Sequence, residues 1–84
     1  MTREDFIFTI GYDGDGPVVD KKSAKASGKL GTEELFRQGF LKAAVRSAVF
    51  AGNENEEKLV LELYNKEVNR KLGSFAELRA VFGV

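Results

Sequence analysis

The chain has 84 residues, contains neither cysteine nor histidine, and balances 13 basic residues against 13 acidic ones, so its formal net charge is zero. A chain of this length is expected to form one domain, residues 1–84, with no disulfides and no thiolate metal ligands. The neutral balance argues against a dedicated nucleic-acid or membrane-surface protein, because such proteins usually carry a basic excess.

The apolar runs of the chain are short. A helix that crosses a bilayer needs about 20 apolar residues in succession, whereas the longest runs here, such as residues 48–51, extend over a few residues. The N-terminal residues include Glu4 and Asp5, at a position where a secretory signal peptide carries positive charge. We therefore expect no membrane span and a cytoplasmic location.

Residues 6–12 are mainly β-branched and aromatic, which predicts a first strand. Side chains alternate along a strand, and those expected to share one face are Phe6, Phe8, Ile10 and Tyr12. Residues 13–17 are rich in glycine and aspartate and contain the single proline, which is typical of a turn. Two valines at 18–19 then begin a second strand, so residues 6–22 are predicted to form a β-hairpin.

A connection rich in glycine and lysine follows, at about residues 20–31. Three interpretations of residues 21–31 stay open: an extension of the second strand, a short helix that ends at Gly28, or a loop. The segment carries four lysines and no acid between its first and last lysine: Lys21, Lys22, Lys25 and Lys29. These side chains are candidates for weak phosphate or nucleic-acid contacts, although a solvated loop explains them as well.

From residue 32 to residue 84 the apolar residues recur at helical spacing, and three helices are predicted. The first helix is expected to start with Thr32 as its N-cap and to end at Gly52. Its polar face is predicted from residues spaced by four, which are Glu34, Gln38, Lys42 and Arg46.

The second helix is predicted to start from a capping box of Asn53 and Glu56 and to end at Gly73. Its apolar stripe covers more than half of the circumference, so it is either the central element of the fold or part of a subunit interface. The stripe residues selected as interface candidates are Leu61 and Tyr64. Ser74 and Glu77 form a second capping box, which starts the third helix.

The predicted fold is therefore α+β, an N-terminal β-hairpin followed by three α-helices. A two-stranded hairpin with an apolar face is unstable alone in water, so it must lie on the helices or pair with another hairpin. Two copies that join their hairpins would also close the open strand edges. The predicted interface residues of such a homodimer are Phe6, Phe8, Ile10, Tyr12, Leu61 and Tyr64.

No motif specifies a metal, a cofactor or a reaction. The turn at residues 13–16 looks like part of an EF-hand loop, but positions 1 and 12 of that loop would fall on Gly11 and Lys22, which offer no carboxylate. Without histidine and cysteine, the usual base and the most reactive nucleophile are missing. We predict a small noncatalytic interaction or regulatory module that binds a second copy or another protein. The alternative is a weak nucleic-acid-binding protein that uses the Lys21–Lys29 segment.

Overall fold

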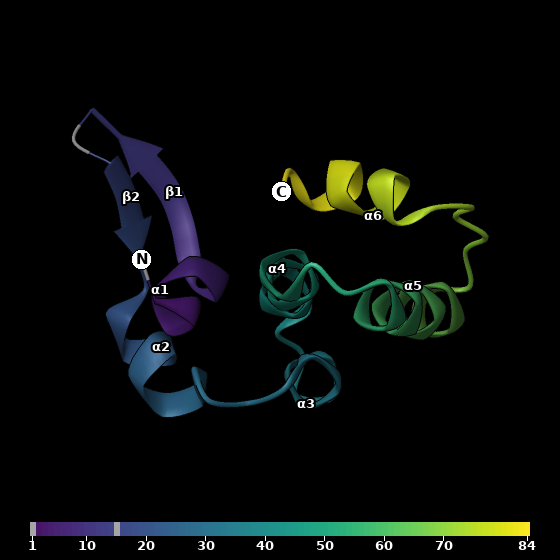
Figure 1. The fold of residues 1–84 in the computed structure, drawn as a ribbon, viewed down its shortest axis with the longest axis horizontal. Helices are drawn as coiled ribbons and strands as arrows, with labels where there is room; N and C mark the ends of the chain where they lie inside the picture. Colours follow the sequence, from purple (N-terminus) through teal and green to yellow (C-terminus); the bar gives the residue numbers. More distant parts are fainter. Residues whose placement is uncertain (1, 15) are drawn as a thin grey trace.

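The computed structural model describes residues 2–14 and 16–84, apart from the side chains of Tyr12 and Asp13. Within these residues it has a two-stranded antiparallel sheet and six helices (Figure 1). The elements in chain order are α1 (Arg3–Ile7), β1 (Thr9–Asp13), β2 (Gly16–Val19), α2 (Lys21–Ser27), α3 (Thr32–Arg37), α4 (Leu41–Ala51), α5 (Glu54–Val68) and α6 (Phe75–Phe82). The predicted α+β class and the hairpin near the N-terminus are confirmed, whereas the predicted count of three helices is wrong.

The chain starts with a helix where the sequence predicted the first half of a strand. The Thr2 hydroxyl caps α1 by accepting a hydrogen bond from the Asp5 N–H at 3.2 Å. Glu4 and Asp5 then place negative charge in the first turn, where the helix dipole favours it. Ile7 at the end of α1 is buried. Capping and burial together outweigh the β-propensity of residues 6–8, so the strand begins only at Thr9.

The connection that the sequence left open is helix α2. Asp20 is its N-cap, because its carboxylate accepts hydrogen bonds from the Ser23 hydroxyl at 2.7 Å and from the Ser23 N–H at 3.1 Å. The Ser23 hydroxyl, followed by the backbone N–H, holds the pKa of the Asp20 carboxyl below its ordinary value. The helix packs on α1 and buries Ala24 between them.

The predicted first long helix is two helices, α3 and α4, with a break at Gly39. Gly39 has φ +88°, and its N–H donates to the Phe36 carbonyl at 3.1 Å, while the Phe40 N–H donates to the Leu35 carbonyl at 2.9 Å. This pair of hydrogen bonds is the Schellman arrangement that ends a helix at a left-handed residue. The predicted N-cap is displaced by one residue as well, since Gly31 is the N-cap of α3 and makes no side-chain bond.

Helix α4 is the central element of the fold. The sequence pattern allowed that position for the second predicted helix, which corresponds to α5. Helix α4 contacts α1, α3, α5 and α6, and Figure 1 shows it between the hairpin side and α5. Small side chains let neighbours approach it from several directions, and its buried residues are Ala43, Ala44, Val45, Arg46, Ser47 and Ala48. The expectation that Arg46 belongs to a solvated polar face is therefore wrong.

Helix α5 ends at Val68, and its C-cap is Asn69, with φ +53°, and not the predicted Gly73. The linker after it is held by Asn65, whose side-chain amide donates to the Leu72 carbonyl and accepts from the Leu72 N–H, both at 3.0 Å. The predicted start of the last helix is confirmed, because the Ser74 hydroxyl accepts a hydrogen bond from the Glu77 N–H at 3.3 Å.

A chain of polar side chains crosses the middle of the molecule. The Arg3 guanidinium donates to the Ser47 hydroxyl at 2.8 Å, the Ser47 and Thr32 hydroxyls are 2.8 Å apart, and Thr32 donates to a Glu56 carboxylate oxygen at 2.7 Å. Because Thr32 has one hydroxyl proton and gives it to Glu56, Ser47 must donate to Thr32. The hydrogen bonds therefore run in one direction, from Arg3 to Glu56, and join α1, α4, α3 and α5. The Asn53 side chain, predicted to form a capping box with Glu56, accepts its hydrogen bond from the Asn55 N–H at 2.8 Å.

Gly28 is expected to be intolerant of alanine, although its φ of −65° suits any residue. A Cβ at this position would lie 2.6 Å from Glu4 Cγ and 2.8 Å from Glu4 Cβ, and it would also overlap the Ala24 carbonyl oxygen. We predict that Gly28→Ala lowers the free energy of unfolding by about 1–3 kcal/mol, because α1 must move away from α2. Urea unfolding followed by circular dichroism measures this change.

Gly73→Ala is the matched control for this substitution. A Cβ at Gly73 would have as its nearest neighbour the flexible Glu77 carboxylate at 3.8 Å, so the change is expected to stay within about 0.5 kcal/mol. Equal effects of the two substitutions would contradict the close packing of α1 on Gly28.

Candidate functional site

The β1–β2 hairpin extends beyond α1, away from the helices α4, α5 and α6 (Figure 1). Its strands pair with Thr9 opposite Val19, Gly11 opposite Val18, and Asp13 opposite Gly16, and the register shifts by one residue at Ile10. The base of the hairpin is fixed, because the Asp20 N–H donates to the Phe8 carbonyl at 2.8 Å and the buried Thr9 hydroxyl donates to the Asp5 carbonyl at 2.8 Å.

The hairpin exposes aliphatic side chains above this fixed base. Ile10, at the register shift, is 64% exposed, and Val18 on the neighbouring strand is 39% exposed. In the described residues the sheet has two strands, so each strand has an edge that pairs with no further strand. Exposed branched side chains beside open strand edges are the features by which sheets recruit another chain.

An apolar groove of about 330 Å³ lies at the base of the hairpin. Ile10 forms part of its wall, so the exposed side chain on the hairpin and the groove form one continuous surface. Phe8 and Phe40 support the groove with an edge-to-face contact whose ring centroids are 5.5 Å apart. The lining residues are Ile7, Phe8, Thr9, Ile10, Gly39, Phe40, Leu41, Lys42 and Ala43.

The remaining predicted interface residues have different surroundings. Phe6 is half-buried with its ring centroid 5.6 Å from that of Phe50, and Phe8 is buried. Leu61 is half-buried, and Tyr64 is buried, packing edge-to-face on Phe82 at 5.6 Å. The Tyr12 side chain lies outside the described part of the chain. Figure 1 places α5 and the hairpin on opposite sides of α4, so the predicted residues do not form one surface.

The four predicted phosphate contacts are exposed on α2 and just after it. Three of them, Lys21, Lys25 and Lys29, line a shallow hollow together with Glu4 and Asp5 of α1. Lys21 forms an ion pair with Asp5, with the ammonium nitrogen 3.1 Å from the carboxylate oxygen. No acid lies between these lysines in the sequence, but the fold places Glu4 and Asp5 beside them. The two carboxylates partly offset the local positive charge.

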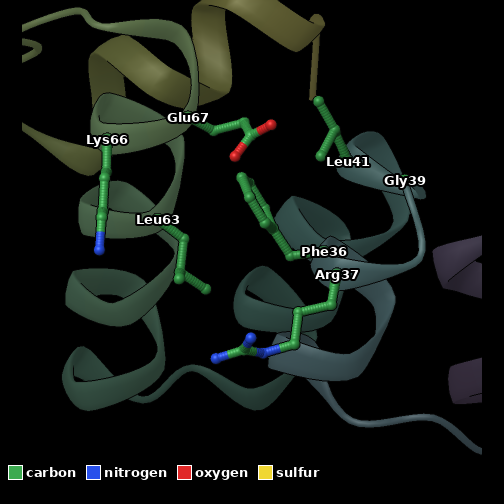
Figure 2. Close-up of a pocket in the computed structure, with 7 residues that line it drawn as sticks. All are labelled: Phe36, Arg37, Gly39, Leu41, Leu63, Lys66 and Glu67. Atoms are coloured by element: carbon green, nitrogen blue, oxygen red, sulfur yellow. The ribbon is translucent and has the colours of Figure 1, made fainter.

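A pocket of about 530 Å³ between α3 and α5 combines apolar and charged residues. Figure 2 shows the side chains of Phe36 and Leu63 between the Glu67 carboxylate at one end and the Arg37 guanidinium at the other. Arg37 donates to a Glu33 carboxylate oxygen at 2.7 Å, and this bond raises the pKa of the guanidinium.

The described residues contain no cluster of three or more carboxylate, histidine or cysteine side chains that would hold a metal ion. In the same residues, no helix has the length and apolar character to cross a membrane. Sequence reasoning missed the polar chain from Arg3 to Glu56 and the buried position of Arg46, and periodicity carried no signal for either. Compared with known proteins, the chain matches no protein family, no curated protein and no solved structure.

Proposed function

We propose that this protein is a noncatalytic interaction module that self-associates through its hairpin. The observation that carries the proposal is the apolar surface that the exposed Ile10 makes with the groove at the hairpin base, with Val18 exposed on the neighbouring strand. Leaving these aliphatic groups in water costs about 25 cal/mol for each Å² of apolar surface that a partner would cover.

A second copy of the chain is the partner that fits this surface. In a two-fold symmetric pair, each contact occurs twice. Ile10 of each copy would therefore lie in the groove of the other copy. Pairing of the strand edges would satisfy backbone groups that otherwise need water. The formal net charge of zero means that two copies do not repel each other over long range.

Sedimentation velocity across micromolar concentrations tests this proposal. The parent protein is expected to shift from monomer to dimer as its concentration rises, and Val18→Lys is expected to keep it monomeric. Val68→Lys is the matched control, because Val68 has the same 39% exposure and belongs to α5, a helix on the opposite side of α4 from the hairpin (Figure 1). A parent protein that stays monomeric throughout the range would contradict self-association. Equal effects of both lysine substitutions would contradict the hairpin as the interface.

A further inference from the structure

Arg46 is a buried arginine whose guanidinium lacks one of its hydrogen bonds. It lies in the middle of α4, is 5% exposed, and its Nε has no hydrogen-bond partner within the described part of the chain. A buried guanidinium normally has a carboxylate or several carbonyls around it, because an unpaired charge that loses its water is strongly unfavourable. The contact found beside it is aromatic: Arg46 Cζ lies 5.7 Å from the centroid of the Phe6 ring. A ring face satisfies a guanidinium partly, but it supplies no hydrogen-bond acceptor.

The same arginine lines a pocket of about 320 Å³, where α1 and α4 meet the end of α6. Arg79 of α6 lines the pocket too, and its Nε donates to the Val84 carbonyl at 3.2 Å. The remaining lining residues are Phe6, Val49, Gly83 and Val84. The lining therefore contains two guanidinium groups, one of which already binds Val84, together with an apolar wall and no Asp or Glu side chain.

We propose that this pocket binds a small phosphate-bearing anion between Arg46 and Arg79. A guanidinium presents parallel N–H donors that match the oxygens of a phosphate. The volume of about 320 Å³ is at the lower end of the range for small-molecule pockets, so the site suits a metabolite-sized ester whose organic part contacts Phe6 and Val49. This site is separate from the hairpin surface and does not depend on self-association.

Thermal unfolding in a buffer free of phosphate tests the proposal, with inorganic phosphate, phenyl phosphate and acetate added at equal ionic strength. The two phosphates are expected to raise the melting temperature of the parent protein in a saturable manner. Arg46→Met is expected to weaken phosphate binding about ten- to hundredfold, because charge-assisted hydrogen bonds are lost. Without ligand, Arg46→Met should melt at the same temperature as the parent or higher, since it removes a buried guanidinium whose Nε has no hydrogen-bond partner.

Arg37→Met is the control, because Arg37 lies on α3 outside this pocket and should leave the phosphate response unchanged. Arg79→Gln provides a second variant if Arg46→Met does not fold, and it should also weaken phosphate binding. Three results would overturn the proposal. They are no saturable response to either phosphate, an equal response to acetate, and a loss of stability in Arg46→Met that is the same with and without phosphate. The last result would show that Arg46 already has a counter-charge within the protein.

Discussion

Substituting Leu35 by alanine is expected to lower the free energy of unfolding by about 2–5 kcal/mol. Leu35 is fully buried on α3, which packs on α4 and α5. The substitution removes apolar contact and leaves a cavity where these three helices meet. An 84-residue domain has a total stability of roughly 4–13 kcal/mol, so this one change removes a large fraction of it. Urea unfolding should show a lower midpoint with an unchanged slope.

The same substitution at Leu61 is the control. Leu61 is half-buried, so Leu61→Ala should have a clearly smaller effect than Leu35→Ala. The Leu35 carbonyl still accepts the hydrogen bond from Phe40 in the variant, because this bond involves only the backbone. The break between α3 and α4 should therefore persist. Equal losses at the two leucines would contradict the placement of Leu35 at the centre of the core.

The features that the sequence predicted well are those set by local chemistry. The hairpin near the N-terminus follows from two β-branched runs around a segment rich in glycine and aspartate, although residues 13, 16 and 17 of the predicted turn lie in the strands. The last helix follows from the Ser74 cap. The helical pattern of residues 54–68 is long enough to be recognised from its period alone. Each of these signals lies within a few residues of the structure that it specifies.

The errors arise where a local signal was present but competed with a stronger pattern. Thr2 followed by Asp5 is a helix start, yet the aromatic residues at 6–8 favoured a strand. Gly39 is a helix stop, yet the apolar residues on both sides continue at helical spacing, so one helix was expected where two exist. In both places, burial of the apolar residues against α4 determines the outcome, and burial is a tertiary property.

The candidate sites depend even more on tertiary structure. The chain of hydrogen bonds from Arg3 to Glu56 joins four helices. One of these bonds, from Arg3 to Ser47, connects residues that are 44 positions apart, and no rule of sequence spacing predicts such a pair. The spacing of four residues placed Arg46 on a predicted polar face, but α4 packs against α1, α3, α5 and α6, and Arg46 is buried among them. The lysine cluster was visible in the sequence, whereas the acids of α1 that lie beside it were not.

Arg3→Met is expected to lower the free energy of unfolding by about 2–4 kcal/mol, although Arg3 is only half-buried. Its guanidinium donates to the Gly28 carbonyl at 2.8 Å, to the Leu30 carbonyl at 2.7 Å and to Ser47 at 2.8 Å. These bonds fasten α1 to the end of α2 and to the central helix. Methionine keeps most of the apolar stem and removes every donor, so all three acceptors lose a charged partner. Chemical unfolding followed by circular dichroism measures the loss.

A double-mutant cycle with Thr32→Val tests whether the polar chain acts as a unit. Arg3 and Thr32 share no hydrogen bond, but both bind the Ser47 hydroxyl. Losing either side chain should therefore weaken the hydrogen bond that Ser47 makes with the other. We expect the two substitutions together to cost about 0.5–2 kcal/mol less than the sum of their separate effects. Arg3→Met combined with Ser74→Ala, which removes the cap of α6, should be additive within about 0.5 kcal/mol because the two residues share no partner. Additive losses for Arg3→Met and Thr32→Val would mean that the hydroxyls do not transmit the Arg3 contact toward Glu56.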